Sequence, residues 1–132
     1  MLLLESLALL STALLFGGMT LFSFAFAAFL FTSLPAEQAG ELLRKAFPYF
    51  YLFVIVVSAV AALLFWPLDR LGSALLIAVA LTTIPARQLL MPAINAATDA
   101  NNASRFKVLH GASVVLTLLH IAAIGYVLLR TL

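Results

Sequence analysis

The sequence predicts an all-α polytopic membrane protein, an antiparallel bundle of four transmembrane helices forming a single domain over residues 1–132. Two observations predict this class. The chain is 65% hydrophobic and only 9% charged, a composition well outside that of soluble globular domains. It also divides into four long apolar stretches, separated by charged or turn-forming residues, and each stretch reaches about the 20 residues that a helix needs to cross a bilayer.

Composition and charge also limit the chemistry of the chain. The absence of cysteine excludes disulfides, thiolate metal sites and cysteine nucleophiles. The net charge of +2 is too small to indicate nucleic acid as a partner, and the basic residues lie at helix ends, where anionic lipid headgroups can meet them. We therefore expect the lipid bilayer as a partner, and no nucleic acid, catalytic residue, metal or cofactor.

The first span is expected over about residues 3–32. Its start carries Glu5 instead of a positive flank, and its apolar run is longer than that of a signal peptide, so we expect it to be retained. Phe22, Phe26 and Phe29 follow one side of the helix. A second stripe repeats small residues every seven positions and predicts close approach of a neighbouring helix backbone. Its members are Gly18, Ala25 and Thr32.

A short amphipathic helix is expected at the membrane surface between the first two spans, over Pro35 to Ala46. Ser33 can cap it, and Glu41 and Lys45 are four residues apart, the spacing of an ion pair on a helix. Mixed charged and apolar faces are typical of a helix lying in the interface. Pro48 then changes the direction of the chain.

The second and third spans are expected to be antiparallel neighbours. The second runs from about Tyr49 to Trp66, two residue types that favour membrane interfaces, and the connection over residues 67–70 is short.

Two prolines predict an interrupted third span. The helix is expected from residue 71 to about residue 90, continuing with a kink towards Asp99. Pro85 and Pro92 each remove a backbone donor, and Pro92 leaves the carbonyl of Gln88 without its usual partner.

The fourth span is expected from about Arg105 to Arg130, after a polar loop over residues 97–104. Four spans place both termini on one side. Five basic residues lie towards the other side against two near the termini, and four against two if Arg87 lies within the bilayer. By the positive-inside rule, the termini are expected outside a cell inner (plasma) membrane. The five are Arg44, Lys45, Arg87, Arg105 and Lys107.

The candidate functional residues are the polar side chains of the last two spans, because polar groups in hydrocarbon are costly. On the fourth span they recur at spacings of three and four, which predicts an inward-facing seam. These residues are His110, Ser113, Thr117 and His120. On the third span, the residues Arg87, Asn95 and Asp99 also fall at multiples of four. We expect Arg87, Asn95 and His110 to form a polar cluster that clamps the two helices.

An ordinary structural alternative stays open for each of these residues. Arg87 can extend to the headgroups, and Asp99 can be a helix-end residue. Both hydroxyl residues of the seam can bond to their own helix, and both histidines can be neutral packing residues.

The function expected is that of a non-enzymatic membrane protein in small-solute handling, or of an accessory subunit in a homo-oligomer or larger membrane complex. A first alternative is a proton-linked transporter that uses His120 and the broken third span. A second is a haem or pigment binder. Because His110 and His120 are about 15 Å apart along the helix, a haem would need another ligand, such as Met19 or Met91, or a second subunit.

Short motifs spread over nearly the whole chain resemble, in order and spacing, those of the bacterial relatives of eukaryotic transmembrane protein 205. They are Gly18, Phe31 with Ser33-Leu34-Pro35, Phe47-Pro48-Tyr49-Phe50, Ala86-Arg87 with Pro92, and Phe106 with His110-Gly111-Ala112-Ser113. The resemblance implies a small four-span membrane protein without known catalysis, in a family classed mainly as a domain of unknown function. The eukaryotic member is associated with resistance to platinum drugs and with membrane trafficking.

Overall fold

The computed structural model describes residues 2–132. Within this range, four helices are long and apolar enough to cross a membrane. They cover Leu2–Ser33, Ala36–Phe65, Arg70–Asp99 and Ala103–Leu129. The predicted class, an all-α bundle of four spanning helices, is confirmed.

The first span is continuous but contains a wide turn. It consists of α1 (Leu2–Thr20), a π-helical segment η1 (Leu21–Phe26) and α2 (Ala27–Ser33). A π-helical turn holds one extra residue and commonly marks a functional site. Nothing in the sequence of this proline-free span predicted it.

The second span, α3 (Ala36–Phe65), corrects one element of the prediction. Residues 36–46 are helical, as expected, but they run directly into the membrane helix instead of forming a separate surface helix. Pro48 lies inside α3 without ending it, because one missing donor is tolerated where neighbouring helices supply other hydrogen bonds. The predicted pair between Glu41 and Lys45 is not formed, since the ion pairs found among residues 2–132 involve other residues.

The third span is interrupted between its two prolines, as predicted, though by a wide turn. It consists of α4 (Arg70–Pro85), the π-helical segment η2 (Ala86–Leu90) and α5 (Met91–Asp99). The N–H of Met91 reaches back five residues to the carbonyl of Ala86. The wide turn therefore lies directly before Pro92, whose nitrogen has no proton to donate.

The last helix, α6 (Ala103–Leu129), follows a tight loop that is shorter than predicted. Asn101 takes a left-handed backbone conformation with φ of 52°, which asparagine tolerates better than most residues. The side chain of Asn102 accepts a hydrogen bond from the backbone N–H of Arg105 at 3.1 Å, and so caps the start of α6.

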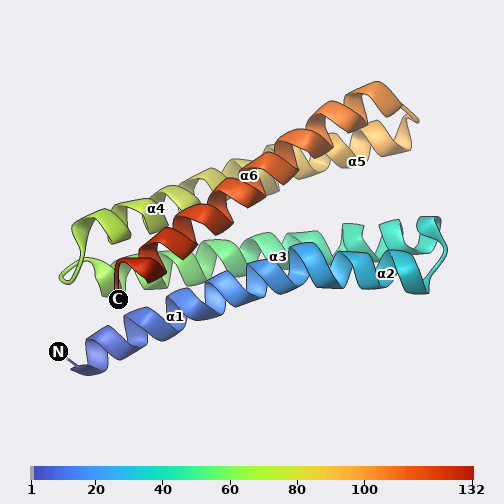
Figure 1. The fold of residues 1–132 in the computed structure, drawn as a ribbon. Helices are drawn as coiled ribbons and strands as arrows, with labels where there is room; N and C mark the ends of the chain where they lie inside the picture. The colour runs from blue at the N-terminus through green and yellow to red at the C-terminus, as the bar shows by residue number, and fades with distance from the viewer. Residues whose placement is uncertain (1) are drawn as a thin grey trace.

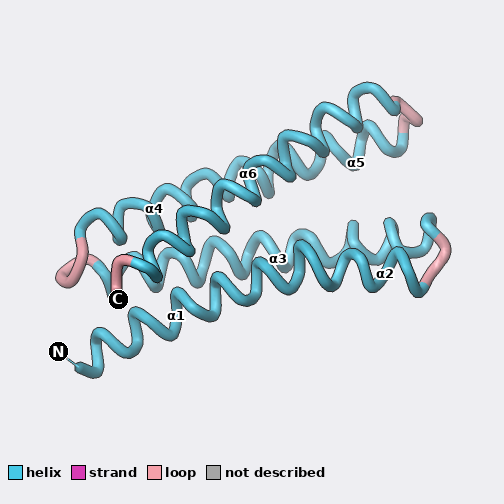
Figure 2. The backbone as a smooth tube through the Cα atoms, in the orientation of Figure 1, coloured by secondary structure: helices cyan, strands magenta, loops and turns pink. Residues whose placement is uncertain are grey.

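The helices form two hairpins that diverge towards one end of the molecule (Figure 1). In the first hairpin α1 and α2 run against α3, and in the second α4 and α5 run against α6. The backbone tube shows the two hairpins separating towards the loops at 34–35 and 100–102 (Figure 2). At the other end, α3 packs closely on α4, and α6 contacts both α1 and α4.

The tightly packed end holds most of the buried core. Its largest fully buried side chains come from all four spans and include Leu15, Val54, Leu76, Ile124 and Val127. Small residues let α3 and α4 approach closely: the buried Ser73 hydroxyl donates to the carbonyl of Ala62 at 2.7 Å.

The length of α3 indicates where the membrane boundaries lie. Its 30 residues extend about 45 Å, whereas the hydrocarbon core is about 30 Å thick. The stretch from Lys45 to Trp66 accounts for about 31 Å of that length. The guanidinium carbon of Arg70 lies over the indole ring of Trp66, 4.1 Å from the ring centre. Tryptophan beside a charged side chain is typical of the headgroup region. The first turns of α3 therefore extend beyond the hydrocarbon.

Candidate binding cavity between the hairpins

A cavity of about 360 Å³ lies where the two hairpins diverge, and residues from all four spans line it. Its walls carry both aromatic and polar side chains. The polar ones are Ser23, Arg44, Tyr51, Asn95, His110, Ser113 and Thr117. Small-molecule sites in proteins commonly have this form, a concave apolar surface with a few polar groups.

The first hairpin supplies an aromatic wall. The ring of Phe22, in η1, stacks on that of Phe50 in α3, with the ring centres 4.2 Å apart and the planes at 9°. The edge of Phe47 completes the group, 5.3 Å from Phe22 at 86°. Offset-stacked and edge-to-face geometries are the favourable ones for aromatic rings, so these three rings pack favourably against one another.

The helix α6 supplies three of the seven polar residues of the cavity. Ser113 is buried, and its hydroxyl lies 3.2 Å from that of Tyr51 on α3. Thr117 lines the cavity one turn further along α6. His110 is exposed, and its ring stacks on Phe106 at 5.3 Å and 6°. Three members of the predicted seam, His110, Ser113 and Thr117, therefore share one cavity.

The fourth member, His120, is buried outside the cavity. Its Nε2 lies 2.7 Å from Oγ1 of Thr82 on α4. The same Thr82 oxygen lies 2.7 Å from the carbonyl oxygen of Ala78. If the hydroxyl proton goes to this carbonyl, the imidazole donates from Nε2 to the threonine oxygen, and in the other tautomer Nε2 accepts the hydroxyl proton. His120 thus faces into the bundle, as predicted, where it joins α6 to α4.

An ion pair connects the two hairpins at the open end. Two nitrogens of Arg44 on α3 donate to the two carboxylate oxygens of Asp99, the last residue of α5, at 2.7 and 2.8 Å. Both side chains are well exposed, and exposed pairs contribute only about 0–1 kcal/mol. Because Arg44 also lines the cavity, this pair of opposite charges lies at the cavity mouth.

The predicted clamp between Arg87, Asn95 and His110 is wrong, since no hydrogen bond joins these residues in the part of the chain that the structure describes. Arg87 instead donates from Nε to the carbonyl of Pro48 on α3, at 3.2 Å. The prediction placed Arg87 against the fourth span, but its guanidinium reaches the second span instead. Asn95 and His110 both line the cavity, whereas Arg87 does not.

Over residues 2–132, no three side chains of histidine, cysteine, aspartate or glutamate lie close enough to hold a metal ion.

Sequence reasoning did not select Arg44 or Tyr51 as site residues. The signal for Arg44 was present, because it and Asp99 are opposite charges expected at the same membrane boundary.

Together, the four spans and the shared cavity define a multi-pass integral membrane protein with a cavity between its helices. The chain belongs to the family of the domain of unknown function DUF4149, whose model matches residues 10–130. No curated protein and no solved structure matches the chain.

Proposed function

We propose that the chain is a non-enzymatic membrane protein that handles a small amphiphilic solute, which it binds in the cavity between its hairpins. The observation that carries this proposal is the composition of the cavity, where an aromatic wall faces a polar one and all four spans contribute. Such a surface suits a ligand with an apolar body and a hydrogen-bonding head.

The polar groups favour an anionic or acceptor-rich head. The guanidinium of Arg44 lies at the mouth, and the hydroxyls of Tyr51 and Ser113 and the amide of Asn95 lie further in. Among the described residues, no carboxylate lines the cavity. A carboxylate or phosphate head would meet these hydroxyl and amide donors, and it would reach the Arg44 charge by displacing the carboxylate of Asp99.

We also propose the setting in which the protein acts. The positive-inside count supports an inner (plasma) membrane with both termini outside. The resemblance to transmembrane protein 205 supports small-solute handling. Assembly with further copies or as an accessory subunit of a larger membrane complex stays a prediction, as do the carrier that uses His120 and the haem or pigment binder.

Thermal unfolding in nanodiscs tests the proposed site with two simple probes, octanoate and octylamine, which share a chain length but carry opposite charges. At ten times its Kd, a bound ligand stabilises the folded state by about 1.4 kcal/mol. We expect octanoate to raise the Tm more than octylamine does. Thr117→Leu, which removes a polar group and fills part of the cavity, should abolish this difference.

Val115→Leu is the matched control, because Val115 lies on the same helix but is exposed on the outside of the bundle. This variant should keep the octanoate response of the wild type. The cavity is not the site if Thr117→Leu and Val115→Leu respond equally, since octanoate would then act through the bilayer.

A further inference from the structure

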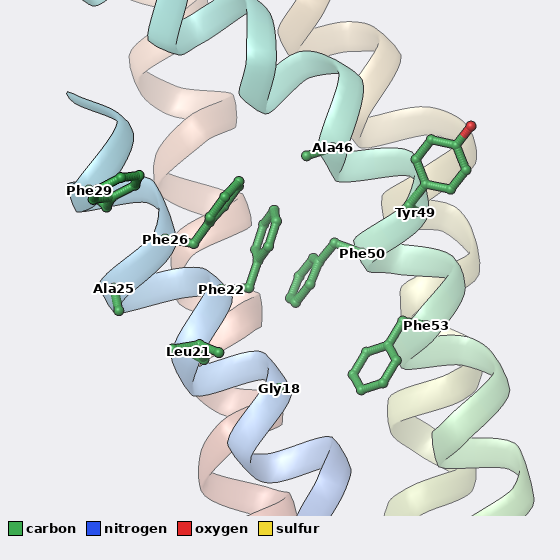
Figure 3. Close-up of a pocket in the computed structure, with 10 residues that line it drawn as sticks. All are labelled: Gly18, Leu21, Phe22, Ala25, Phe26, Phe29, Ala46, Tyr49, Phe50 and Phe53. Atoms are coloured by element: carbon green, nitrogen blue, oxygen red, sulfur yellow. The ribbon is translucent and has the colours of Figure 1, made fainter. Parts of the chain in front are cut away.

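A second, larger hollow of about 730 Å³ lies on the outer face of the first hairpin (Figure 3). We call it the phenylalanine groove. Its walls are the aromatic side chains Phe22, Phe26 and Phe29 of the first span and Tyr49, Phe50 and Phe53 of α3. The stacked pair of Phe22 and Phe50 separates it from the cavity between the hairpins, because both residues line both spaces.

The floor of the groove explains the small residues of the first span. A Cβ atom at Gly18 would lie 2.8 Å from the ring of Phe53, so the glycine makes room for this ring. Ala25 also lines the groove, whereas Thr32 is exposed beyond it. The predicted seam for a neighbouring backbone is therefore wrong within this chain, and the stripe deepens a groove instead.

The groove has the depth of one membrane leaflet. From Gly18 to Phe29 it follows the first span for about 16 Å, about half of the roughly 30 Å hydrocarbon core. All its lining residues lie within the spanning helices, and the hydroxyl of Tyr49 points away from the groove (Figure 3). Its length and apolar lining match an acyl chain running along the membrane normal.

A positive charge lies at the end of the groove towards the headgroups. Lys45 is one helical turn beyond Tyr49 on the same face of α3, and side chains on a helix point towards its N-terminus, here away from the hydrocarbon. Lys45 is exposed, and the ion pairs found within residues 2–132 do not include it. An anionic headgroup above the groove would supply its missing partner.

We propose that the phenylalanine groove holds an acyl chain of an anionic membrane lipid, with the lipid headgroup at Lys45. A second copy of the chain fits less well, because close helix contacts in membranes need small residues at the surface. Here Phe29 and Tyr49, 61% and 76% exposed, stand out on the two sides of the groove and keep another backbone away (Figure 3). This inference does not depend on the proposed solute site.

Native mass spectrometry of protein released from vesicles of phosphatidylglycerol and phosphatidylcholine in equal parts tests the proposal. The wild type should retain phosphatidylglycerol in preference to phosphatidylcholine. Ala25→Phe, which fills the groove, should lose the retained lipid. Lys45→Gln should still retain lipid, but its preference for the anionic headgroup should fall about fivefold.

Two controls separate these effects from general ones. Ala28→Phe adds the same ring at an exposed position outside the groove, and Lys107→Gln removes a charge near the same membrane boundary but on α6. Both should behave as the wild type. Leu21→Trp, at another exposed position of the groove, repeats the filling test if Ala25→Phe does not fold.

The proposal is overturned if filled and control variants retain equal lipid. It is also overturned if the wild type is a dimer that the filled variants dissociate, because the groove would then be an interface between copies. Neither result bears on the solute site, since Ala25 and Leu21 line the groove but not the cavity.

Discussion

The buried hydroxyl and imidazole groups in the spanning helices have partners within the protein. Thr12 and Thr83 donate to the carbonyls of Ala8 and Val79, four residues earlier. Over residues 2–132, no fully buried side-chain nitrogen or oxygen is left without a hydrogen bond. This follows from the high cost of an unpaired polar group in hydrocarbon. Other hydroxyl and imidazole groups bond to a different helix and not to their own, and these bonds can contribute to the packing of the bundle.

The bond between His120 and Thr82 should contribute to stability, and a double-mutant cycle can measure it. We expect the variants His120→Phe and Thr82→Val to show a coupling of about 0.6 kcal/mol in unfolding free energy, the average for such bonds in membrane bundles. Thr83→Val is the control, because Thr83 donates to its own helix. A coupling as large for Thr83 as for Thr82 would contradict the assignment.

Residue spacing predicted side-chain direction well on α6 and poorly on the third span. The a and d spacing of Ser113 and His120 predicted the inward face correctly, because α6 is an unbroken helix. The same reasoning failed for Arg87, which donates to the carbonyl of Pro48 on α3 instead of meeting α6. Proline signalled an interruption, but a sequence pattern does not say whether it becomes a kink or a wide turn.

At the scale of elements, the connection between α3 and α4 is tied to the end of α6. Arg130 donates from Nε and a terminal nitrogen to the carboxylate of Asp69, at 2.9 and 3.1 Å. These hydrogen bonds hold the pKa of the Asp69 carboxyl below its usual value and raise that of the Arg130 guanidinium. Gly72 lies against this carboxylate, and a Cβ there would be 2.8 Å from Oδ2.

Gly72→Ala should therefore disturb the ion pair between Asp69 and Arg130 and lower the Tm at neutral pH. A lowered folded-state pKa stabilises the protein above the unfolded value, about 3.9 for aspartate, and this stabilisation is lost as the pH falls through the folded value. The difference in Tm between wild type and variant should therefore shrink below about pH 4. Thermal unfolding in nanodiscs across this pH range measures it.

Gly111→Ala is the matched control, because a Cβ at Gly111 meets no atom within 4 Å. It should be neutral or stabilising, since alanine is the better helix former by about 1 kcal/mol. If Gly72→Ala were as stable as Gly111→Ala at neutral pH, the ion pair between Asp69 and Arg130 would not stabilise the protein in the way proposed.

Helix positions were largely predictable from the sequence, but their junctions were not. The four apolar stretches and the turn at Pro67 follow from hydropathy and length, which directly measure the cost of crossing a bilayer. The surface helix before Pro48 was expected to be separate, because proline usually interrupts a helix. In the structure α3 continues through it, and Arg87 of the neighbouring span donates to the Pro48 carbonyl.

At the scale of the whole molecule, the two hairpins pack closely at one end and enclose a cavity at the other. The two wide turns, η1 and η2, each end about 11–14 Å before the loops of the open end. They therefore lie at similar depths, near the base of the divergence. The sequence predicted that polar groups of the last two spans face inward, but not that the first hairpin stands apart from them, because helix tilt depends on packing between distant residues.

The central claim is that a solute-accessible cavity lies between the hairpins, and labelling of a single cysteine tests it most directly. The chain has no cysteine of its own, so Thr117→Cys introduces a unique thiol in the cavity, with Ile124→Cys as a fully buried reference. We predict that a charged, membrane-impermeant maleimide labels Thr117→Cys in nanodiscs and that octanoate slows this labelling. Labelling of Thr117→Cys as slow as that of Ile124→Cys would contradict the account.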